Sequence, residues 1–381
     1  MAGARVVVLG GGFGGITAAL ELRKLLGGEP TIALIDRRPA FVMGLRKLWV
    51  LTGRGTLAEG TRTLSALRER GIDVRQGTVG RIDAASRTVT ADTGTVPYDY
   101  LVIALGAEPR PDLVPGFSPA AFNLYDAADV ERLAARVKTF TKGRIVVGIL
   151  GVPYKCPPAP YEAAMLLADH FQQRGLRQAV QIAAFTPQPM SLPVVGAAGC
   201  AQVEGQLASR GIVFTPNRKV ERLEGSTAIS DRGSIEADLF IGVPPHRPPA
   251  LIKSLGLQLQ GEWLFTDPKT LRTSASRIYA VGDVTEIPLA NKLPLPKAGV
   301  FAESQAKVAA AHIAAEITGK QSDAAFDGRG YCYIEIGGGQ AAKVQGHFTA
   351  PGGPQVEVTA PSEQALMEKI EFERSRLNSW F

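Results

Sequence analysis

The sequence predicts an α/β protein that contains two Rossmann-like domains, each with a parallel sheet and flanking helices, and a small C-terminal α+β segment. Two observations support this fold class. An apolar strand at residues 5–9 runs directly into a glycine-rich turn and a helix, and a second series of alternating strands and helices follows from residue 144. The 381 residues, 45% hydrophobic and 20% charged, are sufficient for two cores and are typical of an ordered protein.

The N-terminal turn has the spacing of a dinucleotide-binding site. Gly10, Gly12 and Gly15 match the pattern G-x-G-x-x-G between a strand and a helix. Glycines at these positions make the turn tight, admit a pyrophosphate and let the helix pack on the strand. The next strand ends at Asp36 and Arg37, where an acidic side chain can bind a ribose hydroxyl. We therefore expect a bound dinucleotide; the alternative is a glycine-rich turn with nothing bound.

The remainder of the first domain contains shorter elements. The pattern predicts a loop or broken helix at residues 36–57, a helix at 61–70, and short strands at about 74–82, 87–91 and 95–96. A buried strand then ends at Gly106, where the chain leaves the domain, although such a strand would fit any parallel sheet. A proline-rich stretch at residues 112–122 marks a domain boundary.

The second domain begins with a turn that departs from the glycine spacing. Gly148 and Gly151 are present, but prolines, Lys155 and Cys156 fill the rest of the turn before a helix at residues 158–174. The positive end of that helix, together with Lys155, should favour a thiolate at Cys156. The alternative is a small apolar side chain that closes a tight turn.

The later part of the chain completes both domains. Strands at residues 180–185, 212–215 and 238–243 and helices at 126–140 and 201–210 complete the second unit, in which Cys200 is expected to be buried packing. A strand at residues 277–281 ends at Gly282 and Asp283, and a helix at 300–317 begins just after Lys297. We expect the first domain to comprise residues 1–112 and 247–320, and the second residues 113–246.

The C-terminal segment, residues 321–381, differs from the two domains. Residues 331–336 alternate around Cys332, a glycine turn follows, and residues 341–348 are the expected hairpin partner. In the terminal helix at residues 362–381, an apolar stripe is expected to dock on the body of the protein, with a membrane face as the alternative. The stripe consists of Leu366, Ile370, Leu377 and Phe381.

Charge and cysteine content limit the classes of partner. The net charge of +6 favours anionic partners, but no basic block with interleaved aromatics indicates nucleic-acid binding. Three cysteines without a C-x-x-C pair predict neither a secreted disulfide framework nor a zinc site. No run reaches the roughly 18 apolar residues of a membrane span. We expect a cytoplasmic protein without a secretory signal; contact with the inner face of the cell membrane and a homo-oligomeric state are left open.

Four motifs carry a resemblance to a known group of flavoenzymes. These are C-P-P-A-P-Y-E at residues 156–162, G-D-V at 282–284, L-P-K-A-G at 295–299 and G-Y-C-Y at 330–333. Over residues 5–381 the chain resembles the flavin-dependent sulfide:quinone oxidoreductases and the flavoprotein subunit of flavocytochrome c sulfide dehydrogenase. The resemblance implies bound FAD, with Gly106, Gly282, Asp283 and Lys297 among its contacts.

The same resemblance implies the chemistry. Cys156 and Cys332 would form a redox disulfide over the flavin, and Glu162 would carry protons. A third cysteine and a channel histidine found in some members have no match here, which favours a two-cysteine mechanism. No cysteine lies between residues 36 and 60, which predicts non-covalent FAD. The aromatic residues expected to line a quinone pocket are Tyr333, Trp380 and Phe381.

The sequence therefore predicts oxidation of sulfide to sulfane sulfur or polysulfide, with electrons passed through FAD to a quinone. A type II NADH:quinone dehydrogenase has the same architecture and is one alternative, although the second glycine turn argues against it. A cytochrome could replace the quinone as acceptor. A non-enzymatic alternative is a scaffold protein with redox-silent FAD.

Overall fold

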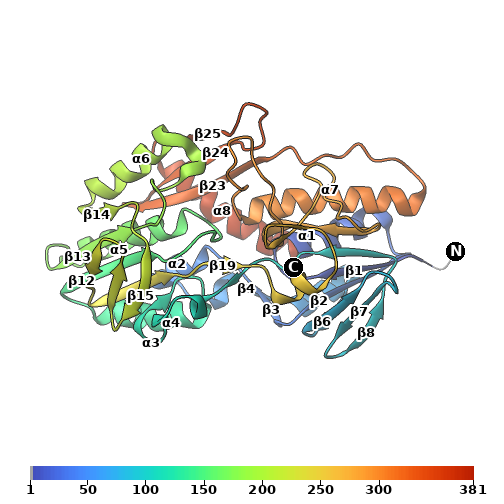
Figure 1. Cartoon of the computed structure of the whole chain (residues 1–381), viewed down its shortest axis with the longest axis horizontal. Helices are drawn as coiled ribbons and strands as arrows, with labels where there is room; N and C mark the ends of the chain where they lie inside the picture. Colours follow the sequence, from blue (N-terminus) through green and yellow to red (C-terminus); the bar gives the residue numbers. More distant parts are fainter. Residues whose placement is uncertain (1–2) are drawn as a thin grey trace.

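The computed structural model describes residues 3–381 and contains two parallel sheets in two lobes (Figure 1). The first sheet has the strand order β22-β9-β1-β2-β5, and all of its strands run parallel. Helices α1 (Phe13–Leu26) and α7 (Gly299–Thr318) pack against each other on this lobe. The strands are β1 (Arg5–Leu9), β2 (Thr31–Asp36), β5 (Asp73–Gln76), β9 (Tyr100–Ile103) and β22 (Ile278–Ala280).

Smaller elements surround the first sheet. An antiparallel sheet contains β6 (Val79–Asp83), β7 (Thr88–Ala91) and β8 (Gly94–Pro97), and α2 (Arg46–Leu51) lies in the expected broken segment. The helix predicted at residues 61–70 is only partly correct. Its first residues form β4 (Thr61–Thr63), which pairs with β3 (Ala40–Val42), because two β-branched threonines favour an extended strand. A 3₁₀ helix (Leu64–Arg70) follows, and the pair β20 (Leu259–Gln260) and β21 (Trp263–Leu264) precedes β22.

The second parallel sheet has the order β11-β18-β12-β13-β14. Its strands are β11 (Phe122–Asn123), β12 (Gly143–Ile149), β13 (Val180–Phe185), β14 (Ile212–Thr215) and β18 (Leu239–Val243), and its helices are α3 (Phe117–Ala120), α4 (Ala127–Thr139), α5 (Ala159–Gln173) and α6 (Gly196–Ser209). An antiparallel sheet that the sequence did not predict follows, with β15 (Val220–Glu224), β16 (Thr227–Ser230) and β17 (Gly233–Ile235). The short strands β10 (Glu108–Pro109) and β19 (His246–Arg247) pair where the chain crosses between the lobes. The predicted fold class is confirmed, while the domain boundaries stay a prediction.

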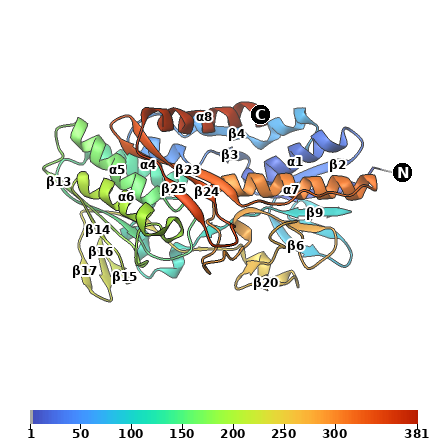
Figure 2. The ribbon, with the colours of Figure 1, turned by 90° about the horizontal axis from the view of Figure 1, so that it is seen from above.

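The C-terminal segment lies across both lobes (Figure 2). It contains the antiparallel strands β23 (Arg329–Gly337), β24 (Gln340–His347) and β25 (Gln355–Val358), of which β25 was not predicted. Helix α8 (Glu363–Trp380) begins at Ser362, whose side chain accepts a hydrogen bond from the backbone N–H of Ala365. Strand β23 packs on α5, and α8 packs on β23, β24 and α1. The segment therefore joins the two lobes.

The buried face of α8 differs from the predicted apolar stripe. Leu377 is buried as expected, but Ile370 is 39% exposed and Met367 60% exposed. The buried positions between Ala365 and Leu377 are instead Lys369 and Glu373, each one turn from the next. Both charged side chains have oppositely charged partners in the body of the protein, and this pairing is what allows them to be buried.

Candidate active site between the two lobes and the C-terminal segment

In the N-terminal glycine turn, Gly10 and Gly15 pack closely against protein atoms, whereas Gly12 faces open space. A Cβ on Gly15 would overlap the carbonyl oxygen of Gly10, so only glycine allows α1 to pack this closely on β1. Gly10 has a φ of +102°, a conformation that favours glycine. By contrast, a Cβ on Gly12 would meet no protein atom within 4 Å. The open side at Gly12 fits the approach of the FAD pyrophosphate to the backbone.

Asp36 lies beside this turn at the end of β2. Its carboxylate accepts hydrogen bonds from the backbone N–H of Gly11 at 2.6 Å and of Arg38 at 2.7 Å. Burial opposes the charge of Asp36, but the Arg38 side chain and these N–H groups hold its pKa below the ordinary value. Arg37, the predicted neighbour, pairs instead with Glu108 at 3.0 Å. The carboxylate that the ribose hydroxyl requires is thus present and ionised, and Arg38 is the arginine that contacts it.

The loop after β22 also contains the residues expected near the flavin. Gly282, like Gly106, has a positive φ, and its N–H donates to the side chain of Gln305 at 2.6 Å. The ammonium of Lys297 donates to the backbone carbonyls of Asp283 at 2.8 Å and Thr285 at 3.0 Å. These two hydrogen bonds fix the loop that carries Asp283, and they use two of the three N–H donors of the Lys297 ammonium.

Additional contacts of Lys297 explain its electrostatic state. Its Nζ lies 3.3 Å from the centre of the Trp263 ring, a cation–π contact. Burial lowers the pKa of Lys297 to about 8, although Asp283 opposes the shift. Burial also raises the pKa of Asp283. Lys297 and Asp283 are therefore a partly desolvated pair at the start of α7.

The turn that carries Cys156 is bound to this same loop. The N–H of Cys156 donates to the carbonyl of Lys297 at 2.7 Å, and the Tyr125 hydroxyl donates to the carbonyl of Cys156 at 3.3 Å. Cys156 has a φ of +49°, which is unusual for a residue with a side chain. Two motifs that are more than 130 positions apart in the sequence are thus joined directly by one backbone hydrogen bond.

The two glycines of this second turn serve internal packing. A Cβ on Gly148 would collide with the rings of Phe185 and Phe240, and one on Gly151 would collide with Pro245. These glycines therefore make room for side chains of the protein. This differs from Gly12, beside which no protein atom lies.

The two predicted redox cysteines lie in one electrostatic environment. Cys332 is on β23, which packs on α5, and Cys156 lies just before α5. Cys156 contributes to the raised pKa of Cys332, and both thiols have Glu162 and Lys369 among the charges that act on them. All three cysteines of the chain are free thiols here, and Cys200 is buried in the core of the second lobe.

The expected ease of ionisation at Cys156 is not found. Solvent reaches Cys156, but the protein surrounds it sufficiently that desolvation raises its pKa to about 12. Burial likewise raises the pKa of Cys332. Lys369 is the cation that opposes the shift at both sulfurs. A sulfur released in this site therefore requires a proton.

A buried ion-pair group lies beside the thiols. The ammonium of Lys369 on α8 bonds to Glu162 on α5 and, at 3.0 Å, to Glu335 on β23. The three side chains are 2%, 4% and 1% exposed, respectively. Trp49 donates its indole N–H to Glu335 at 2.8 Å, and Arg54 pairs with Glu335. Each of the three packed segments thus contributes one member of the group.

The two carboxyl groups in this ion-pair group have opposite pKa shifts. Burial favours protonation of both, but Lys369, Arg54 and Trp49 together hold the pKa of Glu335 at about 2. For Glu162, burial raises the pKa more than the pair with Lys369 lowers it. The two carboxylates hold the pKa of Lys369 above its ordinary value in spite of burial. Glu335 is therefore the permanent counterion of Lys369, and Glu162 is the group that can exchange a proton.

Sequence reasoning found Glu162 but missed Lys369, Glu335 and Trp49. A lysine and a glutamate on a terminal helix and an alternating strand resemble ordinary solvent-exposed charges. They differ from surface charges only in their pairing within the fold, where Lys369 on α8 bonds to Glu162 on α5, 207 positions away. No local sequence signal could have found this group.

The aromatic residues predicted to line a quinone pocket lie at the two ends of one series of contacting rings, with Tyr333 at one end and Trp380 and Phe381 at the other. Trp380 is buried against Phe13 and Phe41, with ring centres 5.4 Å apart in each case. Phe381 lies 6.2 Å from Phe41. The chain continues from Phe13 through Phe372 and Tyr331 to Tyr333, whose hydroxyl donates to Glu368. The rings connect the glycine turn to β23 beneath α8.

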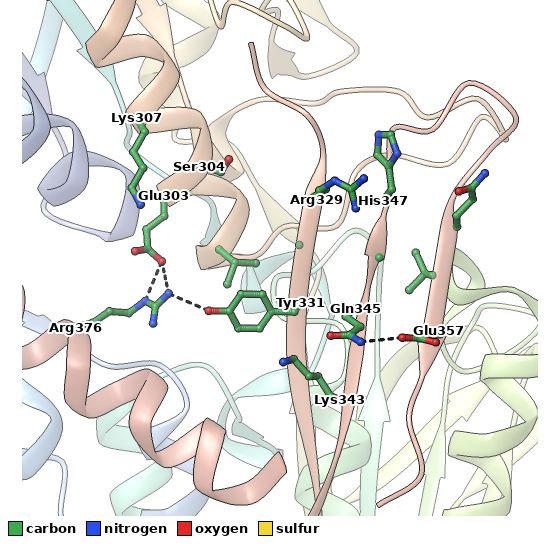
Figure 3. Close-up of a pocket in the computed structure, with 15 residues that line it drawn as sticks. Glu303, Ser304, Lys307, Arg329, Tyr331, Lys343, Gln345, His347, Glu357 and Arg376 are labelled. Atoms are coloured by element: carbon green, nitrogen blue, oxygen red, sulfur yellow. Dashed lines mark hydrogen bonds and ion pairs between the residues drawn. The ribbon is translucent and has the colours of Figure 1, made fainter. Parts of the chain in front are cut away.

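A separate groove of about 940 Å³ lies on the outer face of the C-terminal sheet, between α7 and α8 (Figure 3). Its charged groups pair partly within the groove and partly with residues outside its lining, such as Lys343 with Glu368. Arg376 bonds to Glu303 at 2.8 Å and contacts the Tyr331 hydroxyl at 3.4 Å, and Gln345 donates to Glu357 at 2.8 Å. None of the residues predicted from the sequence for the site lines this groove.

Among residues 3–381, no helix combines the length and the apolar character that crossing a bilayer requires. The same part of the chain has no cluster of three or more histidine, cysteine, aspartate or glutamate side chains placed to bind a metal ion.

The fold combines a dinucleotide turn, a second Rossmann-like lobe and a C-terminal segment with a partly buried cysteine, and these features are those of a flavoprotein oxidoreductase. The chain belongs to the pyridine nucleotide-disulphide oxidoreductase family, whose model matches residues 4–315. The protein is accordingly an enzyme that uses FAD.

Comparison with individual proteins narrows the resemblance. A sulfide-quinone reductase of Aquifex aeolicus is 28% identical over 335 residues, which cover 82% of this chain and 76% of the relative. The X-ray structure of the sulfide:quinone oxidoreductase of that bacterium superposes with a TM-score of 0.90 and 25% identity, covering 99% of this chain and 91% of the other. An alternative NAD(P)H-ubiquinone oxidoreductase of Arabidopsis thaliana is 30% identical, but over 47% of this chain and 38% of its own length. The predicted resemblance to sulfide:quinone oxidoreductases is confirmed.

Proposed function

We propose that this protein oxidises sulfide to sulfane sulfur through a Cys156–Cys332 disulfide and passes the electrons through FAD to a quinone. The observation that supports the proposal is that Glu162, a buried acid with a raised pKa, is among the charges that act on both thiols. The similarity to proteins named sulfide-quinone reductases supports it.

In the first step, hydrosulfide attacks one sulfur of the disulfide. A new S–S bond forms, so that the attacked cysteine becomes a persulfide, and the old S–S bond breaks with its electron pair on the other sulfur. Because desolvation raises the pKa of both thiols, the departing sulfur is poorly stabilised as a thiolate. It therefore takes a proton, and Glu162 is the acid positioned to supply it.

Lys369 and Glu335 set the state of that acid. With Glu335 permanently ionised, Lys369 keeps a partner whether Glu162 is charged or neutral. Glu162 can then release and regain a proton without leaving an unpaired buried ammonium. A second hydrosulfide would attack the outer sulfur of the persulfide, leave with it as disulfane and release the cysteine as a thiol. FAD, when bound, would supply the two-electron acceptor as the two thiols close to a disulfide again.

The FAD contacts in this proposal follow the geometry of the first lobe. Gly10 and Gly15 would keep the turn tight, and Gly12 would leave room for the pyrophosphate. Asp36 would bind the ribose, and Gly106, Gly282 and Asp283 would border the remainder of the cofactor. Lys297 acts on the flavin end by fixing the loop that carries Asp283. The absence of a nearby cysteine in residues 36–60 makes the attachment non-covalent.

The acceptor side is proposed to lie under α8. The chain of rings from Tyr333 to Trp380 and Phe381 provides apolar, aromatic surface suited to a quinone. The exposed Met367 and Ile370 on the outer face of α8 would contact the membrane that holds the quinone, on its cytoplasmic side.

Anaerobic titration of the purified holoenzyme with sulfide tests the function. Sulfide is expected to bleach the oxidised flavin spectrum, and a water-soluble quinone analogue is expected to restore it. The variant Cys332→Ser should lose rapid bleaching, whereas Cys200→Ser, a matched change at the buried third cysteine, should keep it. Full-rate bleaching in Cys332→Ser would discard the disulfide mechanism.

The same titration, repeated with NADH, distinguishes the proposed function from that of an NADH:quinone dehydrogenase. The proposal expects slow bleaching by NADH, because Phe185, Phe240 and Pro245 occupy the space beside the glycines of the second turn. Rapid bleaching by NADH with no response to sulfide would identify an NADH:quinone dehydrogenase instead.

A further inference from the structure

We propose that Trp263 is a positioning residue, whose ring fixes Lys297 and, through Lys297, the turn that carries Cys156. The inference rests on the proposed function, because that function assigns the reaction to the sulfur of Cys156. Trp263 lies on β21, outside every motif expected to bind FAD, and its side chain is 4% exposed. Its role therefore has to be read from its contact with Lys297.

The ammonium of Lys297 has three neighbours for its three N–H groups. Two are the backbone carbonyls of Asp283 and Thr285. The third is the Trp263 ring, because Nζ lies 3.3 Å from the ring centre. An atom in the plane of the ring would overlap its edge at that distance, so Nζ lies over the electron-rich face, which attracts a cation. Without the ring, this side of the ammonium would have no partner.

Trp263 is held in place by its own strand. Strand β21 pairs with β20, and the next residue, Leu264, is fully buried and forms a parallel bridge with Thr285. Thr285 also provides one of the two carbonyls that bind Lys297. The ring and this carbonyl are thus fixed to each other through the backbone, and both contact the same ammonium.

The contacts of Lys297 depend on its positive charge. Burial lowers the pKa of Lys297 to about 8, and the charges of Asp283 and Glu286 oppose the shift. A neutral amine has only two N–H donors and is not attracted to a ring face. Because the Trp263 ring stabilises the charged form, it helps to keep all three contacts in place at neutral pH.

The backbone of Lys297 holds Cys156. The carbonyl of Lys297 accepts a hydrogen bond from the Cys156 N–H at 2.7 Å. Cys156 has a φ of +49°, and a residue with a side chain keeps this conformation only where its surroundings fix it. The other bond to the Cys156 backbone, from the Tyr125 hydroxyl, is longer at 3.3 Å. Loss of the Lys297 contact would therefore let the Cys156 backbone relax and move its sulfur away from the position in which it pairs with Cys332.

Hydrogen exchange of the Cys156 amide, followed by mass spectrometry on the holoenzyme, tests this role. Prolines flank residues 154–156, so a peptide of residues 153–158 contains only three exchangeable amides. Within residues 3–381, the Cys156 amide is the one of these three that donates a hydrogen bond. Trp263→Leu should accelerate its exchange about tenfold, and Trp263→Phe, which keeps a ring face, about threefold.

Two further variants separate positioning from packing. Tyr98→Leu removes a buried ring from the core of the same lobe and should leave the exchange of the Cys156 amide unchanged. Lys297→Met should accelerate this exchange at least as much as Trp263→Leu. If Trp263 acts through Lys297, Trp263→Leu should add nothing in the Lys297→Met protein. Additive effects of the two changes would overturn the positioning role.

Stopped-flow bleaching of the flavin by sulfide tests whether the role extends to the reaction. Trp263→Leu should lower the maximal rate about tenfold and leave the half-saturating sulfide concentration almost unchanged, because the position of the sulfur is disturbed and the binding of sulfide is not. Faster exchange in Trp263→Leu, together with a parent protein that sulfide does not reduce, would retain the contacts and reject the proposed function. Unchanged exchange, or faster exchange with an unchanged maximal rate, would overturn the positioning role.

Discussion

Replacement of the buried lysine Lys369 should destabilise the protein by an amount that depends on pH. Lys369→Met keeps a long unbranched side chain but leaves Glu162 and Glu335 without their common cation. One of the two carboxyl groups must then be neutral in the folded protein. Because the ordinary pKa of glutamate is 4.5, neutralising it at pH 7 costs about 3 kcal/mol, and removing one partner of a buried pair typically costs 3–5 kcal/mol.

The same reasoning gives the pH dependence. At pH 5 the unfolded chain already holds part of that proton, so the cost of neutralising the carboxyl falls to about 1 kcal/mol. Lys369→Met should therefore be strongly destabilised at pH 7 and only mildly destabilised at pH 5. Urea unfolding of the holoenzyme, followed by circular dichroism at both pH values, measures the difference.

A matched control separates this effect from the loss of any lysine. Lys343→Met removes the partner of Glu368 in a pair that is partly exposed, and it should cost less than about 1 kcal/mol at both pH values. Adding Glu162→Gln to Lys369→Met should restore part of the lost stability, because the second buried carboxyl is gone. If Lys369→Met loses no more free energy of unfolding than Lys343→Met, or loses the same amount at both pH values, the two buried carboxylates do not depend on Lys369.

Three further predictions concern the cofactor turn, acid stability and the terminal helix. Gly12→Ala should leave the melting temperature of the FAD-free protein unchanged but weaken FAD binding about tenfold in a fluorescence titration, whereas Gly80→Ala, also in open space, should affect neither. The ionised Glu335 should contribute up to about 3 kcal/mol to the free energy of unfolding above pH 4.5, and this contribution should disappear as the pH falls to about 2. Acid-unfolding curves of Glu335→Gln should lack this change. Trp380→Ala should cost about 3–5 kcal/mol in urea unfolding, against less than about 1 kcal/mol for Met367→Ala on the exposed face; equal losses would contradict the packing of α8.

Strand positions could be predicted closely wherever an apolar run ended at glycine or at a polar turn. The bounds of β13 and β14 are those expected, and β12 differs by one residue. In β12, residues 145–149 are buried on both faces, which requires a continuous apolar run. Strands β15 to β17 were missed, since they alternate weakly and lie partly exposed at the edge of the second lobe.

The candidate site could be predicted only where its chemistry is local. The glycine turn and Asp36 follow from one strand–turn–helix unit, and Cys156 from one helix start, whereas Glu162 and Cys332 were implied only by the family resemblance. Lys369 was missed because an apolar stripe was assumed to define the buried face of α8, whereas this helix buries paired charges. The pKa of Cys156 was predicted in the wrong direction, because helix-end electrostatics are visible in a sequence and desolvation by distant segments is not.

In the proposed mechanism, Cys156 and Cys332 alternate together between a disulfide and two reduced cysteines. Protein oxidised by a quinone analogue and protein reduced anaerobically by sulfide are alkylated, digested without reductant and analysed by mass spectrometry. The oxidised sample should contain a disulfide-linked pair of peptides with Cys156 and Cys332. After sulfide this pair should disappear, and the two cysteines should be recovered in alkylated or persulfidated form. Recovery of both cysteines as alkylated free thiols in both samples would contradict it.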